Sequence, residues 1–146
     1  MKAFTRGWIV LILLAFTLPG ISSAQATNLT GKWRITWLAN GEPAGKPNTI
    51  NLTESSSSDK LVNLSGSFIA DNGEKCAVSG HISHDSNRQL DMKISCDTWS
   101  ISITGMVAVD GQQINGGYMV HYPSGPSIGD YVMDKMICML PEGCGI

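Results

Sequence analysis

The sequence has little charge and no basic cluster. Charged side chains make up 15% of its 146 residues, and 10 Lys and Arg residues stand against 12 Asp and Glu residues, for a formal net charge of −2. Proteins that bind nucleic acids need clustered Lys and Arg to neutralise phosphates. We therefore expect no nucleic-acid partner.

Long hydrophobic runs are also missing. The longest, GWIVLILLAFTL at 7–18, follows Lys2 and Arg6 and precedes small residues that end at Ala26. A membrane-spanning helix needs about 20 consecutive apolar residues, so this run is too short. A positive start, a short apolar stretch and an A-x-A end are typical of a secretory signal peptide. We expect 1–26 to be this signal, and the protein to be secreted or periplasmic without stable insertion in a membrane.

C-x-x-C spacing, which is common in zinc and redox sites, is absent. The cysteines that follow the signal segment are Cys76, Cys96, Cys138 and Cys144. An even number of cysteines in an exported chain predicts disulfides, here two. We expect no metal and no cofactor.

The segment 27–146 has no helical hydrophobic period and has the length of one domain. Short runs of alternating apolar and polar residues, separated by turn residues, predict antiparallel strands. Eight strands are expected, at about 30–38, 48–53, 61–69, 76–83, 89–96, 99–108, 113–122 and 130–138. The predicted fold is an all-β, eight-stranded antiparallel up-and-down meander barrel with two disulfides, because closure removes exposed sheet edges.

The predicted hairpins give one consistent register. The pair Asp110-Gly111 favours a two-residue turn, which places Gly105 opposite Gly116. A loop centred on Ser86 places Cys76 opposite Cys96, where a disulfide is geometrically reasonable. Cys138 and Cys144 would then close a small C-terminal loop, although sequence alone leaves other connectivities open.

Four glycines fall at inward positions in the middle of predicted strands: Gly66, Gly80, Gly105 and Gly116. Glycine weakens a strand unless it permits a bend or a close approach. Two interpretations remain open at this point. The glycines permit the strong coiling of a small barrel, or they leave space for a cavity inside it.

The first predicted strand begins with Gly31-Lys32-Trp33, and Lys135 lies near the end of the last. With this G-x-W motif the chain resembles the calycin group of lipocalin-like and avidin-like barrels. In that group the tryptophan packs across the closed end of the barrel, under a basic side chain from a late strand. The resemblance implies that Trp33 and Lys135 meet at the floor, although lipocalins prefer Arg where Lys135 stands.

Trp37 follows Trp33 by four residues, or about 13 Å along a strand, so it belongs to the opposite end. Further aromatic residues are predicted at that end, with Trp37: Phe68, Trp99, Tyr122 and Tyr131. They would form a ligand-binding mouth, or they would plug it as core. The segments 40–48 and 122–130 are predicted to be the mouth loops.

Residue types found in catalytic and metal sites are present without a recognisable constellation. Two groups come closest, namely His81, His84 and Asp85 around one turn, and His121, Ser124 and Asp130 near another. The first lacks a third clear ligand and is interpreted as surface histidines. The second has no fixed order or geometry. We expect no enzyme, and an uncharacterised barrel enzyme is the third hypothesis.

The sequence favours an exported, non-catalytic barrel that binds a small, partly apolar molecule at its open end. The alternative is a protein-binding barrel of the inhibitor or immunity type that acts through the mouth loops. A hollow lumen beneath Trp37 and Trp99 would favour the first, and a filled lumen with an ordered, protruding 123–130 loop would favour the second. N-x-[ST] sites occur at Asn28, Asn51 and Asn63, where glycan is possible in a eukaryotic host.

Overall fold

A computed structural model describes residues 28–56, 61–83 and 88–137. The expected signal peptide and the predicted Cys138–Cys144 link lie outside these residues. Nine strands make up the described chain: β1 (Gly31–Ala39), β2 (Glu42–Pro43), β3 (Asn48–Ser56), β4 (Leu61–Ile69), β5 (Lys75–Ser83), β6 (Gln89–Ser95), β7 (Ser100–Val107), β8 (Gln113–Tyr122) and β9 (Gly125–Lys135). Within these ranges no helix is long and apolar enough to cross a membrane.

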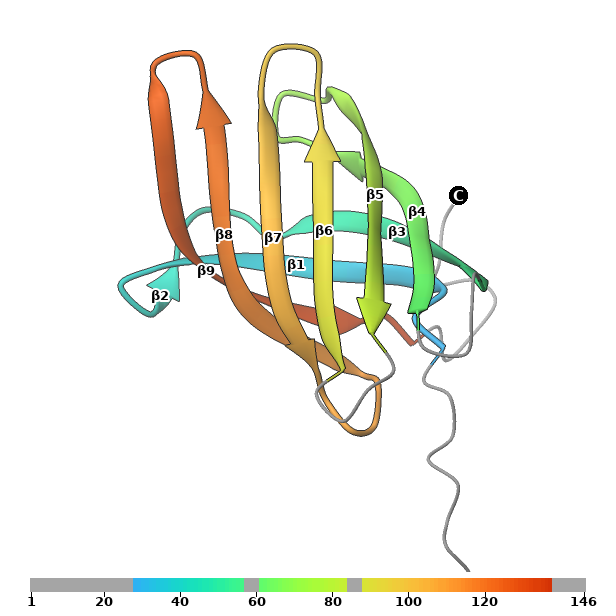
Figure 1. The fold of residues 1–146 in the computed structure, drawn as a ribbon. Helices are drawn as coiled ribbons and strands as arrows, with labels where there is room; N and C mark the ends of the chain where they lie inside the picture. Colours follow the sequence, from blue (N-terminus) through green and yellow to red (C-terminus); the bar gives the residue numbers. More distant parts are fainter. Residues whose placement is uncertain (1–27, 57–60, 84–87, 138–146) are drawn as a thin grey trace, which may run out of the picture.

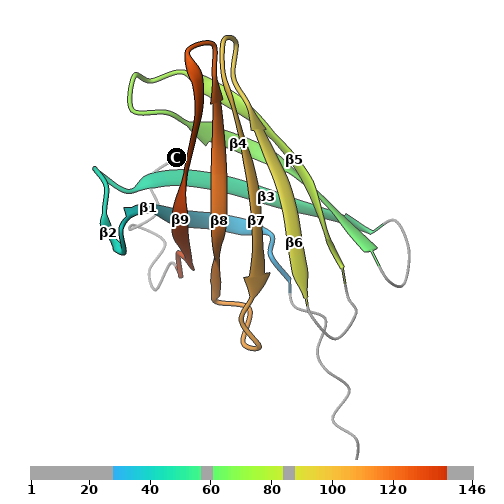
Figure 2. The same cartoon turned by 60° about the vertical axis from the view of Figure 1, so that its left-hand side comes forward.

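The predicted meander is confirmed, and it closes. Neighbouring strands pair antiparallel in the order β2-β1-β3-β4-β5-β6-β7-β8-β9, and β9 also pairs with β1. Eight long strands therefore form the barrel, while β2 only extends the connection between β1 and β3. Strands β6 to β9 run steeply across β1 and β3, which lie behind them (Figures 1 and 2).

The predicted register is also confirmed where the strands are described. Gly105 pairs with Gly116, and a disulfide joins Cys76 to Cys96. The β7–β8 turn differs in detail from a two-residue hairpin loop. Its N–H···O bond runs from Gly111 to the carbonyl of Ala108, at 2.9 Å, and Gly111 adopts a φ of 68°. The register predicted from the alternation along the strands is therefore correct, although the predicted type of turn is wrong.

The prediction of a long loop at 122–130 was wrong, because β9 begins five residues earlier than expected. Tyr122 pairs with Gly125, which leaves a two-residue turn between β8 and β9. Pro126 had suggested a loop. Pairing of β9 with β1 ends at Asp130, so Pro126 lies on a stretch that pairs with β8 alone, and an edge tolerates proline. The same strand ends at Lys135, short of the predicted end at 138.

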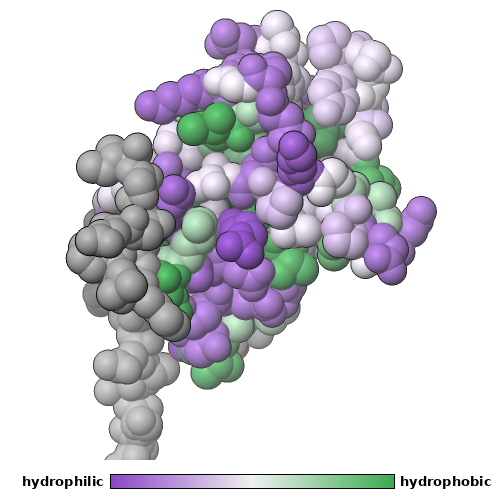
Figure 3. Space-filling model, turned by 180° about the vertical axis from the view of Figure 1, so that it is seen from behind, coloured by the Kyte–Doolittle hydropathy of each residue, from purple (hydrophilic) through white to green (hydrophobic). Residues whose placement is uncertain are grey.

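Buried apolar side chains fill the interior. They include Trp33, Ile35, Ile50, Leu52, Leu64, Ile82, Leu90, Ile94, Ile103, Ile114, Tyr131 and Met133. Hydrophilic and intermediate residues cover most of the outer face seen in Figure 3, with separate hydrophobic residues between them. This inside–outside split follows from the alternation along each strand.

The floor has the geometry that the calycin resemblance implied. Trp33 is fully buried, and its Nε1–H donates to the carbonyl of Leu29 at 2.8 Å. The Nζ of Lys135 lies 5.8 Å from the centre of the Trp33 ring and donates to the carbonyl of Asn28 at 2.6 Å. A cation over an indole face contributes about 0.5–2 kcal/mol. Side-chain contacts therefore join the first and last strands of the barrel, β1 and β9, in addition to their backbone pairing.

The inward glycines let neighbouring strands approach closely. A Cβ on Gly116 would lie 2.0 Å from the carbonyl oxygen of Thr104, and one on Gly66 would lie 1.8 Å from that of Asn51. Both contacts are with backbone, which cannot move aside without shifting a strand. These positions therefore support the coiling interpretation rather than an open cavity beside them.

This close approach predicts different effects at two neighbouring glycines of β8. Gly116→Ala should lower the free energy of unfolding by about 1–3 kcal/mol, as overpacking does. Gly117→Ala should change it by less than about 0.5 kcal/mol, because its Cβ would meet the oxygen of Gly129 at 3.6 Å and Oδ1 of Asp130 at 4.0 Å, which are ordinary contact distances. Urea unfolding of both variants measures the difference. Equal effects would contradict the account of the glycines.

Candidate functional site

A pocket of about 420 Å³ opens at the end of the barrel that carries the β4–β5 loop and the β6–β7 and β8–β9 turns, at the top of Figure 1. Its lining residues are Trp37, Ala44, Asn48, Phe68, Ala70, Asp71, Asn72, Trp99, Ile101, Tyr118, Val120 and Tyr122. Four of the five predicted mouth residues are therefore in the lining. The fifth, Tyr131, is not.

The five aromatic rings of the pocket come from four segments and contact one another in two groups. On one side Trp37 of β1 lies edge-on to Tyr118 of β8 at 4.8 Å between centroids, and to Phe68 of β4 at 6.2 Å. On the other side Trp99, just before β7, lies 6.1 Å from Tyr122 at the end of β8. Such edge-to-face and tilted contacts stabilise aromatic pairs at these distances.

Tyr131 belongs to the core next to the pocket. It is 1% exposed, and its ring lies 6.4 Å from Trp37. Its hydroxyl has no hydrogen-bond partner among the described residues, and a Cβ on Gly105 would lie 2.3 Å from it. Burial raises the pKa of this phenol, so it stays neutral. The absence of a side chain at Gly105 makes the space for this hydroxyl.

Hydrogen bonds to polar side chains at the rim of the pocket fix the indole ring of Trp37. Its Nε1–H donates to Oδ1 of Asn48 at 2.7 Å. The side-chain amide of Asn48 in turn donates to Oδ1 of Asp71, also at 2.7 Å. Since the indole N–H is satisfied by Asn48, the ring offers its carbon surface to the pocket.

Glu74 holds the second tryptophan in a similar way. Trp99 Nε1–H donates to Oε2 of Glu74 at 3.1 Å, and the backbone N–H of Asp97 donates to Oε1 at 2.8 Å. The hydrogen bond from Asp97, followed by that from Trp99, holds the pKa of Glu74 below its ordinary value of 4.5. Glu74 thus ties the β4–β5 loop to the β6–β7 turn.

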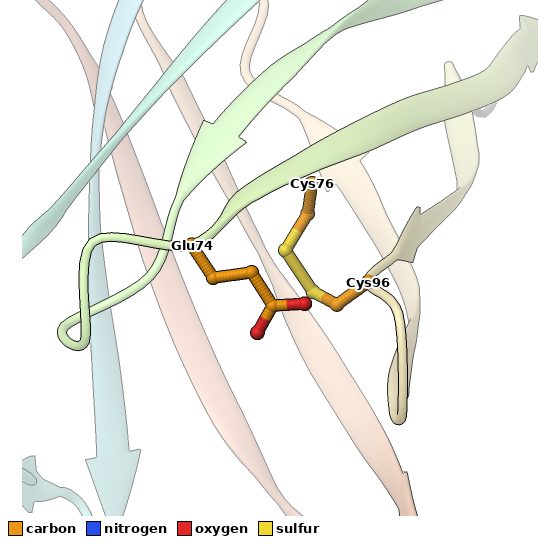
Figure 4. Close-up of side chains that lie close together, drawn as sticks. All are labelled: Glu74, Cys76 and Cys96. Atoms are coloured by element: carbon orange, nitrogen blue, oxygen red, sulfur yellow. A yellow bond between two sulfur atoms is a disulfide. The ribbon is translucent and has the colours of Figure 1, made fainter.

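Glu74 also lies beside the Cys76–Cys96 disulfide (Figure 4). The carboxylate and both sulfurs come within 4.8 Å of one another. The sulfurs are bonded to each other, whereas metal ligation by cysteine needs thiolates. In this state the group is a covalent and hydrogen-bonded brace of the mouth, and it offers no metal site.

The groups considered for metal binding or catalysis are not brought together in the described residues. On the outer wall His81 Nε2 lies 3.7 Å from Oδ2 of Asp91, while His84 and Asp85 fall outside the described residues. His121 contacts Ser102 Oγ at 3.0 Å and faces solvent. Ser124 is in the β8–β9 turn, and Asp130 pairs with Gly117 four residues before His121 along β8.

Sequence reasoning missed several lining residues. Tyr118 was an inward position of the predicted β8 strand, and its alternation with Val120 and Tyr122 was a usable signal. Asn48 and Asp71 carried no such signal, because their part in the pocket depends on which loops meet across the barrel. The same limitation applies to Asn72 in the β4–β5 loop.

The comparisons with known proteins support the architecture alone. No family model matches the chain, and no curated protein matches it. Among solved structures, a redesigned beta barrel, b11L5F_LGL, has a TM-score of 0.50 and 11% identity, covering 75% of this chain and 92% of its own. A second redesigned barrel, mFAP1, bound to DFHBI, has a TM-score of 0.50 and 10% identity, covering 73% of this chain and 94% of its own.

The bonds of Glu74 predict a pH-dependent contribution to stability. The pKa of Glu74 is lowered in the folded state, so its contribution is present above about 4.5 and is lost as the pH falls through the lowered value. Glu74→Gln should therefore be less stable than the unmodified protein at pH 7. Urea unfolding at a series of pH values should show the difference vanishing below the lowered pKa.

Glu42→Gln is the matched control, since Glu42 is exposed on β2 at the same end of the barrel. It should leave stability unchanged across the same pH range. A constant difference between Glu74→Gln and the unmodified protein at all pH values would contradict the role of the carboxylate.

Proposed function

We propose that this protein is an exported, non-catalytic barrel that binds a small, partly apolar molecule in the mouth pocket. The observation that carries the proposal is the lining of that pocket. Five aromatic rings converge on a space of about 420 Å³, within the size range of small-molecule sites. Asn48, Asp71 and Asn72 supply polar groups at its rim, which suits a ligand with one polar end.

The interior below the pocket is filled by buried side chains, which is what the protein-binding alternative expected. A ligand would therefore lie at the mouth with one side toward solvent. The Trp37–Asn48 and Trp99–Glu74 bonds hold two of its walls before any ligand arrives. A preformed site loses less conformational entropy on binding.

Two further considerations support the proposal. The segment 1–26 has the pattern of a signal peptide, which argues for export of a single domain that begins near Thr27. The redesigned barrel mFAP1 holds the small molecule DFHBI, which illustrates that a barrel of this architecture can accept such a ligand. The Trp33–Lys135 floor supports a calycin-like origin.

The protein-binding alternative has an observation of its own. Met119 of β8 and Ile128 of β9 form a cross-strand pair on the outside of the barrel, and their side chains are 40% and 75% exposed. Exposed apolar residues on a projecting hairpin are found at protein interfaces. This pair lies outside the pocket, so the two functions can be tested separately.

The proposal predicts one saturable site for a neutral apolar probe. N-phenyl-1-naphthylamine should bind with one-to-one stoichiometry and quench tryptophan emission, because Trp37 and Trp99 line the pocket. The double variant Trp37→Ala with Trp99→Ala should bind at least about tenfold more weakly. Emission from the buried Trp33 would show that this variant remains folded.

Met119→Ala with Ile128→Ala is the control for binding elsewhere. It removes the exposed apolar pair and should leave probe affinity unchanged. Loss of binding in this variant, with normal binding in the tryptophan variant, would place the probe on the outer wall and favour the protein-binding alternative. Absence of saturable binding to the unmodified protein would refute the proposed function for ligands of this class.

A further inference from the structure

The lining of the mouth pocket contains one acidic side chain and no basic one. Among the described residues that line it, Asp71 is the one carboxylate, and no Lys, Arg or His is included. A second carboxylate, that of Glu74, lies behind Trp99 and accepts its indole N–H. The rim therefore presents two negative groups beside five aromatic rings.

Neither carboxylate forms an ion pair with a cation of the described residues. Within its described part, the protein has one ion pair, between His81 and Asp91 on the outer wall. Asp71 receives a hydrogen bond from the neutral amide of Asn48, and the donors to Glu74 are also uncharged groups. A cation bound in the pocket would meet negative charge without displacing a protein partner.

The two ends of the barrel differ in how their tryptophans are used. At the floor, the ring of Trp33 has the ammonium of Lys135 above it at 5.8 Å. In the described residues this is the sole cation over a ring, so the mouth rings have no protein cation facing them. Aromatic faces attract cations through the ring quadrupole, most strongly for Trp and when the cation is partly desolvated.

From these observations we propose that the mouth pocket selects organic cations, namely quaternary ammonium or protonated amine groups attached to a small apolar body. This inference rests on the proposed function and specifies its ligand class. The cationic group would lie among the rings of Trp37, Tyr118 and Trp99. Asp71 would add long-range attraction from the rim.

A pair of compounds with the same shape tests the charge preference. Phenyltrimethylammonium and tert-butylbenzene differ chiefly in that a quaternary nitrogen replaces a quaternary carbon. Tryptophan quenching and calorimetry on the folded protein should show the cation binding about tenfold more tightly. The affinity of the cation should also fall as ionic strength rises, whereas that of the neutral compound should not.

Two aspartate variants test the part played by the rim. Asp71→Asn keeps an oxygen that can accept from Asn48 and removes the charge. It should weaken binding of phenyltrimethylammonium by about two- to fivefold and leave the affinity for tert-butylbenzene unchanged. Asp91→Asn, on the outer wall, should leave the affinities for both compounds unchanged.

The outcomes separate this inference from the function on which it rests. If tert-butylbenzene binds as tightly as phenyltrimethylammonium, the pocket has no charge preference and the inference is wrong, while the proposed function stands. If neither compound nor N-phenyl-1-naphthylamine binds, the proposed function fails as well. If Asp71→Asn weakens binding of both compounds equally, Asp71 acts only by positioning Asn48 and Trp37. That result would contradict its electrostatic role in the inference.

Discussion

Pairing of β1 with β9 is the constraint on which the rest of the structure depends. It runs from Trp33 opposite Lys135 to Leu38 opposite Asp130, and it turns a meander with two open edges into a closed barrel. Closure with only eight strands demands strong coiling, which the backbone contacts at Gly66 and Gly116 permit. Along the same pair of strands, Trp33 lies at the floor opposite Lys135, and Trp37 lies toward the mouth opposite Tyr131.

The mouth pocket follows from a change of side-chain type along the barrel. Mainly aliphatic residues fill the interior, together with Trp33 and Tyr131, whereas five aromatic residues line the mouth pocket. Tryptophan is suited to this boundary, because its ring packs while its N–H needs a polar partner. Asn48 and Glu74 provide those partners from the rim. The walls of the pocket are therefore fixed by groups that a ligand has no need to displace.

Much of this architecture could be predicted from alternation along the chain. The register that placed Cys76 opposite Cys96 followed from it, because a shift by one residue would turn apolar side chains outward. The start of β9 could not be found, since proline at Pro126 is compatible with a loop or with an unpaired edge. Tyr131 was expected at the mouth but lies in the core, because the stagger of a tilted barrel places it against Gly105. Side-chain partners such as Asn48 depend on tertiary contacts that no local pattern encodes.

The most direct test of the account is to locate a bound ligand by NMR. Intermolecular nuclear Overhauser effects would be measured between bound N-phenyl-1-naphthylamine and assigned side-chain protons, aromatic and methyl, of the isotopically labelled protein. Binding in the mouth predicts effects to the rings of Trp37, Trp99 and Tyr118, and none to the buried ring of Trp33 at the floor. Effects confined to Met119 and Ile128 on the outer wall would contradict the assignment of the pocket as the binding site.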